Sequence, residues 1–471
     1  MIPNLLNNNL KTSVVFLFLL TVPIMVFSGC ERNRVRNFSN VLLITLDTVR
    51  YDYIGACGNP GIKTPWLDLL SKRWIQFTEA RSSVNSTNPS HASIFTSFHV
   101  RKHGLLANCN RLSDNVVTLA ELCQKKGMVT GGFISSAILN AGLSGLDRGF
   151  QTYEEVNIEK ITRTCDITTQ IFLEWFNKNR ANPFFAWLHL YDAHAPYKPP
   201  VPYNRIYYPD LKSPDSNLEN PLSESLKTAM KDGFIEWLWN TSDIKFPPAQ
   251  YMGAISFIDE QIGKVFINLK KSELFDKTLI VITADHGESL GEHDIFYLHI
   301  TVFDNDLRVP LIIYSGNKQY KNKFIVDPVS LVDVLPTIVE MADINVPHNV
   351  KEAWDGQSLV PLFEGKKSGK QKNKYIIAER DGLDATTFIN GQWKYLVKRL
   401  AQKKGGDDKL EFLYNIFTDP QENINYMDSE QVVGDRFRKD VQLWLETIQA
   451  VGITKIGENA KKILYSLQYI H

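Results

Sequence analysis

The sequence predicts an α/β fold in which a mostly parallel central sheet is flanked by helices and followed by a small C-terminal antiparallel subdomain with a terminal helix. From Val41 onward, apolar β-rich runs alternate with amphipathic helical stretches, the pattern of a parallel sheet with crossover helices. This alternation ends at Glu364–Asn373, a Gly/Lys-rich linker. The 471 residues also exceed the roughly 250–300 that one hydrophobic core supports, which favours two domains.

The larger domain, predicted over residues 40–363, contains four candidate strands and three helical segments. The strands are Val41–Leu46, Phe184–Leu190, Leu279–Thr283 and Leu311–Tyr314. The helical segments are Pro65–Trp74, Thr118–Lys126 and Met252–Leu269. Thr64 before Pro65 forms an N-cap and first-turn pair. Asn204–Pro248 is irregular and rich in Pro, Asn, Ser and Asp, so we expect it to cross the ligand-binding edge of the sheet.

The smaller domain, predicted over residues 374–471, is expected to be a sheet of hairpins. Its candidate strands are Tyr375–Ala378, Ala385–Asn390, Lys394–Lys398 and Glu411–Asn415. Asn390-Gly391 and Gly405-Gly406 are hairpin-type breaks between strands. A final helix is predicted over Val432–Val451.

The N-terminus is predicted to be an export segment, residues 1–30, followed by a polar tether, residues 31–39. Ser13–Ser28 carries no charge, follows Lys11 and runs into Gly29-Cys30, as in an apolar signal region before a cleavage site. The Ser-Gly-Cys ending resembles the lipobox of bacterial lipoproteins. We therefore expect lipid on Cys30 to tether the protein to a membrane of the bacterial periplasm or cell envelope. Phe27, where Leu is usual, leaves ordinary signal cleavage or an uncleaved anchor open.

Charge and cysteine content narrow the classes of partner. Lys+Arg and Asp+Glu are equal at 52 each, and there is no long basic run, so no nucleic-acid partner is expected. Four further cysteines are widely spaced: Cys57, Cys109, Cys123 and Cys165. Their number permits disulfides in an exported protein, and their spacing equally suits small buried side chains.

Metal-ligand residue types follow the predicted strand ends. Asp47, His194 and Asp285-His286 each come just after a strand, and ligands of open α/β sheets bind beyond the carboxyl ends of the strands. Carboxylates beside an imidazole indicate a divalent cation and favour Mn²⁺ or Zn²⁺ over Ca²⁺ or Mg²⁺. Thr87, in Thr87–Ser93 (TNPSHAS), supplies a hydroxyl that such a cation could activate. By itself Thr87 could equally be a turn residue before Pro89.

The chain resembles the sulfatase branch of the alkaline-phosphatase-like superfamily. Ten stretches match in the expected order: NVLLITLDTVRYD, TPWLDLLSKRWIQFTEA, TNPSHAS, TLAELCQKKGMVT, WLHLYDAHAPYKPP, ISFIDEQIGKV, TLIVITADHGESLGEH, RVPLII, VSLVDVLPTIVEMADI and LYNIFTDPQENIN. The resemblance implies a single metal ion, Mn²⁺, Ca²⁺ or Zn²⁺, held by Asp47, Thr87, Asp285 and His286. It also implies that Thr87 is the nucleophile. His194 and His299 would then hold the oxygens of the transferred group or protonate the leaving group, with His293 as the alternative to His299.

Thr87 departs from the family pattern in a way that changes the expected chemistry. Sulfatases have Cys or Ser two residues before the Pro, and this residue is oxidised to formylglycine. Oxidation of a secondary alcohol gives a ketone, so formylglycine cannot form at Thr87, and Ser86 lies one residue too early. Attack by a threonine alkoxide forms an ester. A phospho-threonine can be hydrolysed, whereas a sulfo-threonine lacks the elimination route of the formylglycine hydrate.

We therefore expect hydrolysis or transfer of a phosphate or phosphonate ester, with a small molecule, a lipid headgroup or a glycan as the substrate. Two alternatives stay open: a sulfuric ester hydrolase that works without formylglycine, and a catalytically silent binding relative.

Three further departures alter the surroundings of the nucleophile. His91 stands where most sulfatases have Arg, Thr48 replaces the second Asp of an Asp-Asp pair, and Gly132–Ser136 replaces a Lys-x-His that grips sulfate. His91 and His103 fit the edge of the site and a structural loop equally well. Three other charged residues are expected to be solvated: Glu288, Glu292 and Lys198.

Overall fold

The structure, a computed structural model, describes residues 38–71, 74–108, 110–208, 224–231, 236–238, 241–316, 320–366, 375–400, 409–448 and 454–455. All of them belong to the unit formed by residues 36–471. The predicted export segment with Cys30, most of the tether, Cys109 and the Gly405-Gly406 break lie outside the described residues. The predicted domain limits, 40–363 and 374–471, stay predictions.

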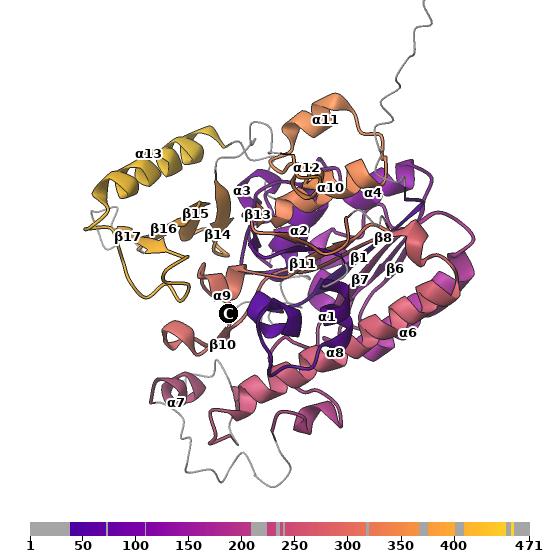
Figure 1. Ribbon diagram of the computed structural model, residues 1–471, viewed down its shortest axis with the longest axis horizontal. Helices are drawn as coiled ribbons and strands as arrows, with labels where there is room; N and C mark the ends of the chain where they lie inside the picture. The colour runs from indigo at the N-terminus through magenta and orange to yellow at the C-terminus, as the bar shows by residue number, and fades with distance from the viewer. Residues whose placement is uncertain are drawn as a thin grey trace, which may run out of the picture. The chain divides into compact units, whose positions relative to one another are not determined.

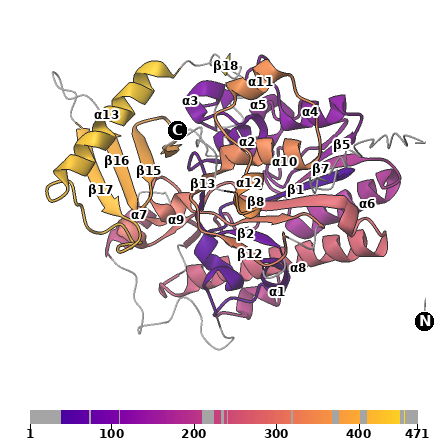
Figure 2. The same ribbon diagram turned by 45° about the horizontal axis from the view of Figure 1, so that its top comes forward.

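An eight-stranded sheet forms the centre of the fold (Figures 1 and 2). In spatial order the strands are β12 (Lys323–Ile325), β2 (Ile75–Phe77), β11 (Leu311–Tyr314), β8 (Thr278–Ala284), β1 (Asn40–Leu46), β7 (Phe184–Leu190), β5 (Val129–Phe133) and β6 (Thr152–Glu154). All run in one direction except β11, which is antiparallel to β8 and β2. The mostly parallel sheet is confirmed, and β7 and β11 have the predicted bounds.

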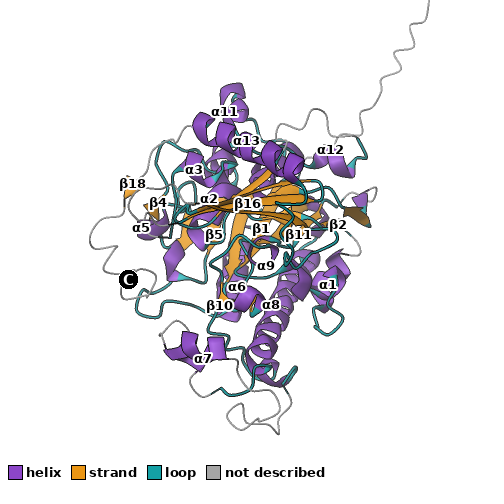
Figure 3. Ribbon diagram, turned by 90° about the vertical axis from the view of Figure 1, so that its left-hand side faces the viewer, coloured by secondary structure: helices purple, strands orange, loops and turns teal. Residues whose placement is uncertain are grey.

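Helices cover both faces of this sheet (Figures 1 and 3). On one face lie α1 (Pro65–Ser71), α6 (Cys165–Asn179) and α8 (Phe246–Lys271); on the other lie α2 (Thr87–Thr96), α4 (Leu119–Lys125) and α10 (Val334–Met341). Helix α8 begins six residues before the prediction because Pro247 and Pro248 occupy its first turn, where no N–H is needed. The seven residues of β1 and of β8 are all buried, so the core extends along the central strands.

Helix α1 begins at Pro65 as predicted, but the group that caps it differs from the prediction. The Thr64 hydroxyl donates to Asp68 Oδ1 (2.8 Å) and does not cap the helix. Instead, the backbone N–H groups of Trp66 and Leu67 donate to the two carboxylate oxygens of Asp259 on α8, at 3.1 and 2.7 Å. A carboxylate from a neighbouring helix thus satisfies donors that α1 leaves unpaired.

A second, four-stranded sheet is antiparallel, as predicted. Its strands are β14 (Ile376–Glu379), β15 (Ala385–Asn390), β16 (Trp393–Arg399) and β17 (Lys409–Asn415), in that order. Helix α13 (Gln431–Thr447) packs on one face through Phe437 and Val441 (Figure 2). Residues from the segment after β8, Val302 and Leu307, pack against the other face. The small sheet is therefore held between α13 and the loops that follow β8.

Short elements complete the described chain: α3 (Val100–His103), α5 (Ala141–Ser144), α7 (Glu224–Lys231), α9 (Asp304–Leu307), α11 (His348–Ala353), α12 (Val360–Phe363), β3 (Ala80–Arg81), β4 (Asn110–Arg111), β9 (Ser289–Leu290), β10 (Phe296–Leu298), β13 (Val329–Ser330) and β18 (Thr454–Lys455). Among the described helices, none is both long and apolar enough to cross a membrane. Cys57, Cys123 and Cys165 are free thiols, and the last two are buried.

Candidate active site

Two carboxylates meet at the carboxyl edge of the central sheet. Leu46 pairs with Ala284 across β1 and β8, so the next residues, Asp47 and Asp285, leave the sheet side by side. Both are fully buried. Asp285 Oδ1 accepts the backbone N–H groups of His286 (2.8 Å) and Thr48 (3.2 Å). These bonds fix the orientation of the Asp285 carboxylate.

Each carboxylate keeps one oxygen that accepts no hydrogen bond within the described part of the chain: Asp47 Oδ1 and Asp285 Oδ2. Burial, together with the charge of Asp285, raises the pKa of Asp47 well above its usual range. Two buried carboxylates with free oxygens are unfavourable unless a positive charge lies between them. The pair is therefore suited to a cation.

His286 completes a possible metal-binding group. Its Nδ1–H donates to the carbonyl oxygen of Gly287 (3.0 Å), which leaves the lone pair on Nε2. Burial lowers the pKa of this ring well below 6.5, so the imidazole is neutral, as a ligand must be. One ligand atom from each of Asp47, Asp285 and His286 lies within 4.8 Å of the others. Carboxylate oxygens with one imidazole nitrogen form a donor set that fits a divalent cation.

Thr87 opens helix α2 next to this group. Its Oγ1 lies 3.4 Å from Nε2 of His286, and the side chain is buried. Two contacts fix the helix start: Asn108 Oδ1 accepts the Asn88 N–H (2.9 Å), and the Ser90 hydroxyl donates to the Asp285 carbonyl (2.7 Å). The hydroxyl is thus held at a helix N-terminus, where the aligned peptide dipoles favour negative charge.

His299 and Glu288 form a pair beside the cation group. His299 Nδ1 donates to Glu288 Oε1 at 3.2 Å, and its ring centroid lies 4.4 Å from that of His286. Burial alone would lower the pKa of His299, but the hydrogen bond and the charge of Glu288 raise it to about 9. Glu288 is completely buried and also accepts the Tyr197 hydroxyl (3.0 Å), so the prediction that it is solvated is wrong.

His194 lies at the edge of the same cluster. Its ring stacks on Tyr191 (centroids 4.5 Å apart) and meets the His299 ring edge-on at 5.1 Å. His293, the alternative to His299, stacks instead on Phe303. All six predicted site residues therefore lie in one cluster: Asp47, Thr87, His194, Asp285, His286 and His299.

Two of the departures from the sulfatase pattern, Thr48 and Gly132–Ser136, lie next to Asp47 and His189. The Thr48 hydroxyl donates to the backbone carbonyl oxygen of Asp47 (2.8 Å), so its proton is used in a hydrogen bond to the main chain. Gly132–Ser136 crosses the end of β5, and the N–H of Ser135 donates to His189 Nδ1 (3.3 Å). His189 Nε2–H then donates to Asp47 Oδ2 (3.1 Å). We did not predict a role for His189. The sequence does carry a sign of it, because a histidine stands one residue before the end of a buried strand.

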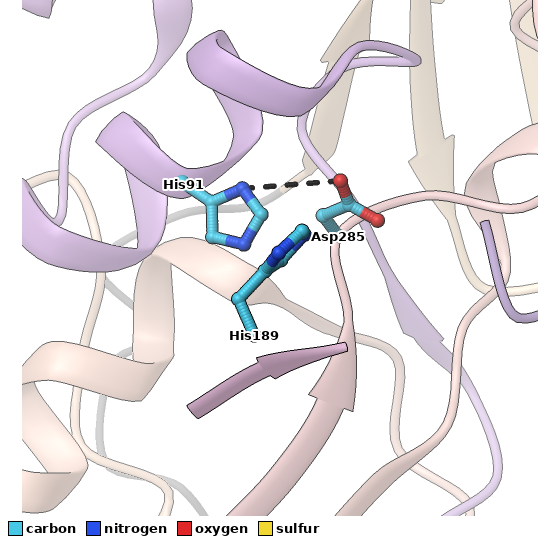
Figure 4. A group of neighbouring side chains, drawn as sticks. All are labelled: His91, His189 and Asp285. Atoms are coloured by element: carbon cyan, nitrogen blue, oxygen red, sulfur yellow. Dashed lines mark ion pairs between the residues drawn. The ribbon is translucent and has the colours of Figure 1, made fainter. Parts of the chain in front are cut away.

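His91 lies on helix α2, one turn after Thr87, and is completely buried. It is therefore neither a residue at the edge of the site nor part of a loop. Together with His189 and Asp285 it forms a second cluster, whose ligand-type atoms also lie within 4.8 Å of one another (Figure 4). Burial lowers the pKa of His91 and of His189 to about 4, so both rings are neutral. His103 is buried and contacts Ser93 Oγ (3.1 Å) on α2, a packing role.

The chain is similar to known proteins in sequence and in fold. The family profile described as Sulfatase matches residues 39–344. The arylsulfatase of Clostridium perfringens is 25% identical over 466 residues, covering 83% of this chain and 91% of that protein. The phosphonate monoester hydrolase of Agrobacterium radiobacter superposes with a TM-score of 0.67 at 22% identity, covering 86% of this chain and 94% of that chain. For BT4656 with its substrate D-glucosamine-2-N,6-O-disulfate, the TM-score is 0.69 at 18% identity, covering 87% and 97%.

Proposed function

The chain belongs to the sulfatase family, whose members hydrolyse sulfuric or phosphoric esters, and we propose that it acts on a phosphate or phosphonate ester through Thr87. One observation carries the proposal: the residue in the nucleophile position is a threonine whose Oγ1 lies 3.4 Å from the unprotonated Nε2 of His286, beside two free carboxylate oxygens. A threonine cannot become formylglycine, and a phosphoryl-threonine is an intermediate that water or an acceptor can release.

Asp47, Asp285 and His286, with Thr87 Oγ1, would hold a divalent cation, of which Mn²⁺, Ca²⁺ and Zn²⁺ are the candidates. When bound, such a cation lowers the pKa of a coordinated hydroxyl and neutralises charge on the group under attack. In the reaction, Thr87 Oγ1 gives up its proton to a water molecule and forms the bond to phosphorus, while the bond from phosphorus to the departing ester oxygen breaks. Asp47, Thr87, Asp285 and His286 are buried, so charges at this point act in a low dielectric.

The leaving group departs on the side of the histidines. Glu288 occupies Nδ1 of His299 and leaves Nε2–H as the proton donor to the departing oxygen. His194, whose ring meets that of His299 at 5.1 Å, is placed to contact an oxygen of the transferred group. General acid catalysis of this kind contributes about 10²–10⁴ in rate.

Thr87→Ala tests the proposal. Aryl sulfate, phosphate mono- and diesters and phosphonate monoesters are assayed side by side on the purified protein, with metal content measured in parallel. We expect phosphorus esters to be turned over, the Ala variant to lose turnover while keeping about one metal per chain, and a chelator to abolish activity until a divalent cation is restored. Thr87→Ser keeps a hydroxyl and is the matched control, provided that mass spectrometry shows the new serine has not been oxidised to formylglycine. Full activity in Thr87→Ala would exclude the mechanism.

Hydrolysis of sulfate esters is the second candidate, and the similarity to an arylsulfatase favours it. It predicts the reverse order of rates in the same assay. The similarity to BT4656, whose substrate is a sulfated amino sugar, makes a glycan ester a substrate to include.

We further propose that the protein is exported to the periplasm or cell envelope and anchored by lipid on Cys30, from the Ser-Gly-Cys ending of the apolar N-terminal segment. Metabolic labelling with a fatty acid should mark the mature protein, and label that persists in Cys30→Ala would exclude this anchor.

A further inference from the structure

A chain of hydrogen bonds ends on the backbone of Thr87. The Trp187 Nε1–H donates to Thr45 Oγ1 (2.8 Å), and Thr45 Oγ1 lies 3.0 Å from Nε2 of His91. Nδ1 of His91 lies 2.8 Å from the carbonyl oxygen of Thr87, one helical turn earlier. All four residues are buried. The chain therefore runs from the sheet strands β7 and β1 to the first residue of α2.

The direction of these bonds follows from their ends. A carbonyl oxygen only accepts, so Nδ1 of His91 must carry the proton and donate to Thr87. Nε2 then keeps its lone pair and accepts the Thr45 hydroxyl, whose oxygen in turn accepts from Trp187. Each donor and acceptor named in these three hydrogen bonds has a partner, so together they form a complete buried network.

A metal ion at His91, His189 and Asp285 is the competing interpretation of this cluster (Figure 4). A ligating imidazole must present an unused lone pair. His91 donates from Nδ1 and accepts at Nε2. His189 accepts the Ser135 N–H at Nδ1 and donates from Nε2 to Asp47. Both rings are therefore engaged in hydrogen bonds, although His91 Nδ1 lies only 3.8 Å from Asp285 Oδ2.

We propose that His91 is a positioning residue: through its bond to the Thr87 carbonyl oxygen it fixes the nucleophile relative to His286 and the two carboxylates. The expected effect on turnover rests on the proposed function, whereas the hydrogen bond by which His91 positions Thr87 does not. Since about 1 Å of misplacement at a reacting group can cost about 100-fold in rate, the network has a measurable effect on turnover.

Two substitutions separate the bonds of His91. Asn at position 91 keeps an N–H near the place of Nδ1 and can still donate to Thr87, whereas Gln places its amide near Nε2 and reaches only Thr45. Thr45→Val removes the hydroxyl while keeping the shape of the side chain. We expect kcat to fall about 100-fold in His91→Gln and less in His91→Asn and Thr45→Val, with KM and metal stoichiometry unchanged.

A substrate-independent measurement accompanies the kinetics. In ¹⁵N-histidine-labelled protein, with His91 assigned by its absence from His91→Asn, we expect a neutral ring protonated at Nδ1, whose signal does not move when diamagnetic Zn²⁺ is added to one equivalent. An Nε2–H tautomer, a second equivalent of metal that shifts the His91 signal, or unchanged kcat in both His91 variants would each overturn the proposal. If the wild-type chain turned over none of the esters, the proposed function would fail while the NMR result still decided the role of His91.

Discussion

A buried lysine connects the second sheet to the loop that carries the active site, and its removal should be costly. Lys394, on β16, is completely buried, and its Nζ lies 2.9 Å from Asp304 Oδ1 and 2.7 Å from Glu422 Oε1. Asp304 begins α9, whose Asn305 and Asp306 carbonyls accept the N–H groups of Glu288 and Gly287 at 3.1 and 2.7 Å. Lys394 thus supports the helix that holds the segment after His286.

The magnitude follows from the partners that remain in Lys394→Met. Asp304 keeps Arg81, whose Nη2 lies 2.6 Å from Oδ2, so Glu422 is the carboxylate left without a cation, although it still accepts the Asp304 N–H. Breaking a buried pair costs about 3–5 kcal/mol. Burial has already raised the pKa of Glu422 to about 7 despite Lys394, so without the lysine it stays protonated at neutral pH. We therefore expect a loss of about 3 kcal/mol at pH 7, the lower end of that range.

The loss should grow with pH. The wild-type Glu422 is ionised in both states above pH 7, whereas the folded variant holds a proton that the unfolded chain has released. The difference in unfolding free energy then increases by up to about 1.4 kcal/mol per pH unit above 7. Urea unfolding of both proteins at pH 7 and 8.5 measures it, with the exposed Lys398→Met on the same strand as control. A Lys394→Met protein whose unfolding free energy lies within about 1 kcal/mol of the wild-type value at both pH values would refute this reasoning.

Two further predictions concern the framework of the site. Burial raises the pKa of Asp259 to about 7 from 3.8, so the contribution of Asp259 to stability is fully present below about pH 4 and is lost as pH rises through 7. Asp259→Asn should lack this component, worth at most about 4 kcal/mol, and parallel urea-midpoint profiles of the two proteins from pH 4.5 to 8 would contradict it. In Gly287→Ala the new Cβ would lie 2.0 Å from the Asn305 carbonyl oxygen, which must shift the backbone next to His286. We expect at least a tenfold loss of kcat and about 2 kcal/mol of stability, whereas Gly142→Ala, with no atom within 4 Å, should leave both unchanged; equal behaviour of the two variants would contradict the steric argument.

The cluster of site residues was predictable because strand ends are visible in the sequence. Asp47 and Asp285 follow fully buried strands, and parallel strands bring their carboxyl ends to one edge. Glu288 was not predictable in the same way. Its burial depends on Tyr197 and His299, which come from other segments and enclose the carboxylate only in the folded chain. A charged residue next to a glycine carries no local sign of such partners.

The fold shows the same division between local and tertiary information. The apolar run of β11 predicts a strand with its correct bounds but not its antiparallel direction, which depends on the path of the chain between β8 and β11. Thr64-Pro65 correctly marks the start of α1, yet the acceptor for its N–H groups is Asp259, almost two hundred residues later in the sequence. Local chemistry predicts where the helix begins, and a distant residue supplies the cap.

The two charged residues that the family pattern expects near the nucleophile are replaced together. Thr48 removes a negative charge, and His91, neutral because burial lowers its pKa to about 4, removes a positive one. These two replacements offset each other in charge, whereas the loss of the Lys-x-His at Gly132–Ser136 removes one further positive charge; Asp47 and Asp285 remain to balance a divalent cation. What changes is where the positive charge lies. Among the predicted site residues, positive charge comes from His299, whose pKa the hydrogen bond and charge of Glu288 raise to about 9. In the mechanism that we propose, this charge faces the departing oxygen, which favours an ester whose leaving group needs a proton.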